Sequence, residues 1–101
     1  MKYNKLIRDK IPMIIAQSGK TCVVETLSDS NYFDYLSRKL VEEAKEFLES
    51  RDTEELADLE EVLLAILEYK NVSFAELEEI RLKKAEDRGG FKKRLLLKQV
   101  D

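Results

Sequence analysis

Histidine is missing from this chain of 101 residues, and cysteine and proline occur only once each. Without histidine, Ser-His-Asp and Cys-His catalysis and histidine-ligated metals are excluded, so proton transfer would need carboxylates, Lys, Tyr or metal-bound water. The lone Cys22 excludes an internal disulfide and a Cys/His zinc cluster. One proline and three glycines are too few for a β-sandwich with its many turns, so long helices are expected.

Long apolar runs are also missing. The longest, residues 62–67, is far shorter than a membrane span or a signal-peptide core with its flanks. We therefore expect no membrane partner and a reducing, cytoplasmic location. The hydrophobic content of 44% argues against general disorder, and no linker, repeat or low-complexity tract is visible. Residues 1–101 are accordingly treated as one domain.

Charged residues make up 39% of the chain and are unevenly distributed. Residues 42–61 contain ten acids and two bases, whereas the whole chain has a net charge of −3 and its bases gather near both ends. An acidic centre with basic flanks suits a metal–polyphosphate site. The alternative, a solvated helix surface with ion pairs, is the commoner fate of charge runs. Net acidity without alternating basic and aromatic residues argues against nucleic-acid binding.

Capping signals and apolar periodicity predict a mainly all-α fold. We expect helices over residues 11–17, from a Ser28 or Asp29 cap to about Ser50, from an Asp52 or Thr53 cap to about Lys70, and from a Ser73 capping box to Gly89-Gly90. The β-branched residues of 21–26 predict a short strand, and residues 94–98 would pair with it in a small two-stranded β element. A helical tail at 94–98 is the alternative.

Two acidic pairs flank the apolar faces of the long central helices. At about 100° per residue, Glu43 falls just outside the apolar arc of the first helix, and Glu46 lies about 60° further round. Glu55 and Asp58 are placed in the same way on the second. Because a short connection makes such helices antiparallel neighbours, the pairs should meet, and Mg²⁺, with Mn²⁺ as a substitute, would relieve their repulsion. Surface salt bridges are the open alternative, with Lys39, Lys45 and Arg51.

Several short motifs of this sequence resemble those of a known family. Residues 42–46 (EEAKE) fit EExxE and residues 55–58 (ELAD) fit ExxD, and the motifs YNKLIRDKIP at 3–12 and RGGF at 88–91 agree. Together they resemble the MazG-like, all-α nucleoside triphosphate pyrophosphohydrolases, in particular small members described as phosphoribosyl-ATP pyrophosphohydrolase-like. The resemblance covers nearly the whole chain and implies an antiparallel helical bundle. The eight residues between Glu46 and Glu55 make a tighter connection than many members have.

The resemblance implies Mg²⁺-dependent hydrolysis of a nucleotide between its α- and β-phosphates, giving a monophosphate and pyrophosphate in a house-cleaning or nucleotide-pool role. It implies metal ligands at Glu43, Glu46, Glu55 and Asp58. Glu42, with Glu43, is a catalytic candidate, as general base or as a ligand to a second ion. Basic residues expected to bind the substrate phosphates are Lys5, Arg8, Lys10, Lys39, Arg88 and Arg94. The alternative function is a non-catalytic helical interaction module that retains the fold.

Self-association is also expected. Three amphipathic helices in so short a chain leave little core for a well-buried monomer, and association is a usual remedy. We therefore expect a homo-oligomer, a dimer or a tetramer, with the site near the subunit interface.

Overall fold

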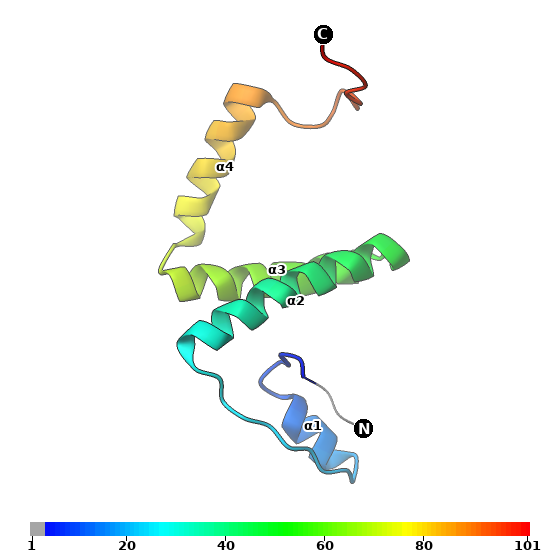
Figure 1. The fold of residues 1–101 in the computed structure, drawn as a ribbon, viewed down its shortest axis with the longest axis vertical. Helices are drawn as coiled ribbons and strands as arrows, with labels where there is room; N and C mark the ends of the chain where they lie inside the picture. Colours follow the sequence, from blue (N-terminus) through cyan, green and yellow to red (C-terminus); the bar gives the residue numbers. More distant parts are fainter. Residues whose placement is uncertain (1–3) are drawn as a thin grey trace.

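The computed structural model describes residues 4–101, and these residues form four helices joined by irregular segments (Figure 1). Tyr3, the first residue of the N-terminal motif, lies outside the described range. The helices are α1 (Ile11–Gln17), α2 (Asp29–Ser50), α3 (Thr53–Lys70) and α4 (Phe74–Arg88). The mainly helical class is confirmed, and the bounds agree with the capping signals to within a residue or two.

The helix ends follow local chemistry. The Ser28 hydroxyl accepts a hydrogen bond from the backbone N–H of Asn31 at the start of α2. The expected capping box is present at α4, where Ser73 and Glu76 each accept from the other's backbone N–H. Left-handed residues end the two long helices: Arg51 (φ 62°) follows α2 and Asn71 (φ 56°) follows α3. Such residues turn the chain sharply, so only two residues separate the end of α2 from the start of α3.

The helices α2 and α3 form an antiparallel hairpin and lie side by side along most of their length (Figure 1). Leu36, Val62 and Leu67 are buried between them. The Phe33 and Tyr69 rings stack with centroids 4.7 Å apart and close the end of the hairpin far from the turn. Glu43 is buried in the same interface, with only 6% of its surface exposed. The hairpin thus contains a charged side chain near its middle.

The rest of the chain does not close around this hairpin. Among the described helices, only α2 and α3 pack extensively, and α4 extends away from the end of α3 (Figure 1). The radius of gyration is 17.9 Å, against about 13 Å for a compact domain of this length. The accessible surface is 9603 Å², about 3,700 Å² more than a folded monomer of 11.8 kDa should expose. A single chain therefore forms a hairpin with appended helices rather than a closed bundle.

The expected two-stranded element is not formed. No strand occurs in residues 4–101, and residues 21–26 and 94–98 are exposed and irregular. They lie at opposite ends of the molecule (Figure 1), so neither finds a pairing partner. An isolated two-stranded ribbon is marginal in water even when its strands are adjacent, and β-branched composition alone does not overcome that. The alternative of a helical tail is not observed either.

None of the helices in the described range has both the length and the apolar composition needed to cross a membrane.

Candidate metal centre

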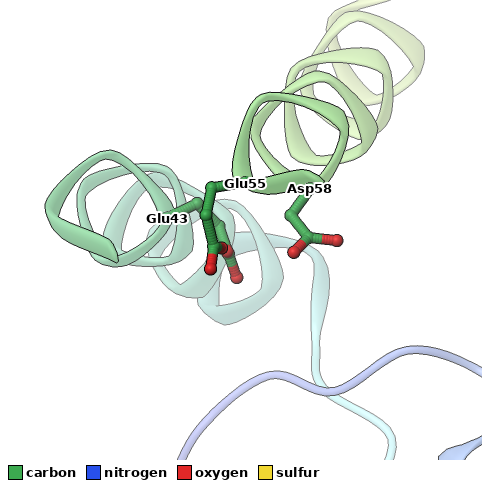
Figure 2. A group of neighbouring side chains, drawn as sticks. All are labelled: Glu43, Glu55 and Asp58. Carbon is green, nitrogen blue, oxygen red and sulfur yellow. The ribbon is translucent and has the colours of Figure 1, made fainter. Parts of the chain in front are cut away.

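Three carboxylates from the two long helices converge on one space. Glu43 comes from the middle of α2, while Glu55 and Asp58 come from the first two turns of α3 (Figure 2). One oxygen of each lies within 4.8 Å of one oxygen of the others. Because Glu55 and Asp58 are three residues apart, they share a helix face, and the short turn at residues 51–52 brings that face to Glu43. The expected meeting of the two helices' acids is observed for these three.

Glu46, the fourth expected ligand, lies beside the cluster rather than in it. It is exposed, one turn after Glu43 on α2, and its carboxyl group neighbours that of Glu43. It also lines a cavity of about 340 Å³ together with Glu43 and Asp58. The structure therefore places Glu46 where it contributes negative charge to the cavity without joining the three-carboxylate group.

The burial of Glu43 corrects the helical-wheel placement. The wheel puts Glu43 just outside the apolar arc and Ala44 and Leu48 within it, yet Glu43 is buried whereas Ala44 and Leu48 are exposed. A helical wheel gives the angular position of each side chain around the axis of α2. The position of α3 decides which of these side chains are buried. Here the buried side of α2 is the one that carries Leu36 and Glu43, and α3 is the helix packed against it.

The electrostatics of Glu43 reflect this burial. Oε1 lies 3.4 Å from the Lys39 ammonium, while Oε2 is buried and has no hydrogen-bond partner among residues 4–101. Burial raises the pKa of the Glu43 carboxyl, and the adjacent carboxyl of Glu46 raises it further, whereas Lys39 lowers it. A buried carboxylate that is only partly compensated is costly, so the group is poised to protonate or to bind a cation.

Arg8 and Lys39 form ion pairs with acids of the site. Arg8, from the segment before α1, donates a hydrogen bond from Nη2 to Asp58 Oδ1 at 2.7 Å. Lys39 lies one turn before Glu43 on α2, and its Nζ is 3.8 Å from Glu42 Oε1 and 3.4 Å from Glu43 Oε1. Both bases and Glu42 line the cavity, and so does Lys5. These expected site residues are thus brought together by the fold.

The other expected basic residues lie elsewhere. Lys10 does not line the cavity, although it is only two residues from Arg8. Arg88 is the last residue of α4 and Arg94 lies in the segment after it, and neither lines the cavity. Figure 1 shows α4 and this segment extending away from the hairpin. Within one chain, these three residues are therefore not part of the site.

Two apolar cavity residues were not expected from the sequence. Ile7 and Ile11 line the cavity beside Arg8 and are half-buried. Their spacing of four residues, on either side of Arg8 in a basic segment, is the signal that could have found them. They line the same cavity as residues of α2 and α3, so the N-terminal segment that carries Arg8 lies beside the hairpin.

Comparisons with known proteins give little further information. No protein-family model and no solved structure matches this chain. Over 53 residues the chain is 47% identical to an uncharacterized protein from Mycolicibacterium smegmatis, a match that covers 52% of this chain and 53% of that protein. The similarity thus spans about half of each protein, and it assigns neither a family nor an activity.

Proposed function

We propose that this chain is a Mg²⁺-dependent nucleotide pyrophosphohydrolase of the MazG-like type, which cleaves a nucleotide between its α- and β-phosphates. The products would be a nucleoside monophosphate and pyrophosphate, in a nucleotide-pool or house-cleaning role. The observation that carries the proposal is Glu43. Its buried Oε2 has no partner among the described residues, and its carboxylate faces the same space as those of Glu55 and Asp58 (Figure 2).

This donor set fits a hard divalent cation. Carboxylate oxygens are the ligands that Mg²⁺ takes, and Mn²⁺ accepts the same ligands. Glu43, Glu55 and Asp58 would hold the ion, with Glu46 adding charge at the edge. A bound divalent cation neutralises phosphate charge and lowers the pKa of water, which removes the need for histidine.

The remaining cavity residues have roles that their positions support. Lys5, Arg8 and Lys39 surround the acids with positive charge and would bind the substrate phosphates. Glu42 is half-buried, lines the cavity and pairs with Lys39, so it can accept a proton from a water molecule in the cavity.

The proposal includes a homo-oligomer, a dimer or a tetramer. The surplus surface of about 3,700 Å² per chain exceeds the roughly 1,000–2,500 Å² that each partner buries in an obligate dimer. Apolar side chains are exposed on every long helix, among them Val41, Leu64, Ile80 and Leu82. A second copy that covers them would also be able to supply Arg88 or Arg94 to the cavity. The proposal also includes a cytoplasmic location, where the exposed Cys22 would stay reduced.

The same apolar surface favours a second candidate, a non-catalytic helical interaction module. Such a module would need the exposed faces of α2, α3 and α4 but not the acidic cluster. Metal binding separates the two candidates, because only the enzyme requires stoichiometric Mg²⁺ or Mn²⁺.

The deciding experiment is incubation with a panel of nucleoside triphosphates in Mg²⁺, with monophosphate and pyrophosphate both quantified. Equimolar amounts of the two products, lost in excess EDTA and restored by Mg²⁺, would support the proposal. Release of inorganic phosphate instead, or hydrolysis that persists in EDTA, would contradict it.

A further inference from the structure

The ion pair between Arg8 and Asp58 joins residues 50 positions apart and lies at the edge of the acidic cluster. We propose that Arg8 is the exchangeable counter-ion of this site: it neutralises Asp58 when no cation is bound and moves to the phosphate of the ligand when the cation takes Asp58. This inference rests on the proposed metal site and adds a coupling between cation and anion binding.

The acidic cluster needs a counter-ion in the absence of a cation. Glu43, Glu55 and Asp58 have oxygens within 4.8 Å of one another, and Glu46 adds a fourth carboxylate next to Glu43. Lys39 forms ion pairs with Glu42 and Glu43, and Arg8 forms an ion pair with Asp58. A divalent cation and a guanidinium on the same carboxylate repel each other and compete for its single negative charge. Cation binding at Asp58 therefore opposes the ion pair with Arg8.

Of the two bases, Arg8 is the one that can leave. The Lys39 side chain is only 18% exposed and is attached to the middle of α2, whereas the Arg8 side chain is 56% exposed. The backbone of Arg8 is anchored, because its carbonyl accepts a hydrogen bond from the Ile11 amide at 3.1 Å and Ile7 is half-buried. The guanidinium can thus rotate away while its backbone stays at the cavity. An exposed ion pair contributes at most about 1 kcal/mol, so breaking it costs little.

The freed guanidinium would remain beside the cavity that it lines with Lys5 and Lys39. A planar guanidinium binds phosphate oxygens in a bidentate manner, and this contact is strongest when the arginine is not already paired. Cation binding would therefore create the anion site, and by linkage an anion would tighten the binding of the cation.

The test compares the wild type with Arg8→Gln and, as a matched control, Lys10→Gln, which removes one charge from the same segment without a contact to the cavity. Isothermal titration with Mn²⁺ alone should show binding about two- to fivefold tighter in Arg8→Gln, the factor that an exposed ion pair represents. Lys10→Gln should bind Mn²⁺ as the wild type does. Equal Mn²⁺ affinity in Arg8→Gln and the wild type would overturn the inference.

A second titration uses inorganic phosphate. In saturating Mg²⁺, Arg8→Gln should bind phosphate about tenfold more weakly than the wild type, whereas in EDTA the two should bind equally weakly. A loss of the same size in both conditions would show that Arg8 is not exchanged and would overturn the inference. If neither the wild type nor any variant binds Mn²⁺, the proposed function is overturned as well. If the wild type and Arg8→Gln bind Mn²⁺ with the same affinity, only the inference is overturned. Circular dichroism confirms that each variant folds.

Discussion

Replacing Glu43 by Gln should stabilise the protein without metal and remove its response to Mg²⁺. The substitution keeps the side-chain volume and deletes a charge that is 94% buried in the structure, where 6% of the residue surface is exposed. Burial and the neighbouring carboxyl of Glu46 disfavour this charge, and Lys39 at 3.4 Å offsets them only in part, so the pKa of Glu43 is raised. A buried polar group without its full set of partners costs about 1–3 kcal/mol, so the net gain expected from Glu43→Gln is about 2 kcal/mol.

The assay is urea denaturation at pH 7, first in EDTA and then in excess Mg²⁺. In EDTA, the free energy of unfolding of Glu43→Gln should exceed that of the wild type by about 2 kcal/mol. In Mg²⁺ at about 100 times its Kd, the free energy of unfolding of the wild type should rise by about 2.7 kcal/mol and that of the variant by almost nothing. The wild type should therefore become as stable as the variant or more stable. Glu49→Gln, at an exposed position of the same helix, is the control and should change neither value.

The pH dependence checks the cause. Because the pKa of Glu43 is raised in the folded state, the folded chain binds a proton that the unfolded chain has already lost. The wild type should therefore recover stability relative to Glu43→Gln as the pH falls from 7 through this raised pKa. A variant that is less stable than the wild type in EDTA at pH 7, or that keeps the full response to Mg²⁺, would refute the reasoning.

The remaining predictions concern the site and the assembly. Asp58→Asn should lower kcat for nucleotide hydrolysis by at least about 100-fold with an unchanged circular dichroism spectrum, and full activity would remove Asp58 from the site. Mg²⁺ affinity, measured by titration calorimetry, should begin to fall at a higher pH than for an ordinary carboxylate site, because protons compete at Glu43; equal affinity at pH 7.5 and 5.5 would contradict this. Ile80→Lys, at an exposed apolar position of α4, should lower the mass found by light scattering, whereas the control Glu79→Lys should not; a monomeric wild type would refute the oligomer. Mixing inactive Asp58→Asn chains with inactive Arg88→Ala chains should restore part of the activity if a second copy supplies Arg88, and no recovery would count against a shared site.

Local signals were sufficient for the helices. Each of these helix bounds depends on residues within a turn or so of the end, as in the Ser28 cap and the Ser73–Glu76 capping box. Such interactions can be read from the sequence because both partners are neighbours along it. The candidate ligands Glu43, Glu55 and Asp58 were found in the same way, since their spacing fixes the helix face on which each lies.

The contacts between elements required the tertiary structure. The turn at residues 51–52 and the crossing of α2 and α3 decided that Glu43 is buried and that Glu46 stays at the edge, because a helical wheel contains no information about which side a neighbour covers. The fold also brought Arg8 to Asp58 across 50 positions, left residues 21–26 and 94–98 too far apart to pair, and directed α4 away from the hairpin. Local energies fix where helices begin and end, whereas distances between distant residues depend on the packing of whole helices against one another.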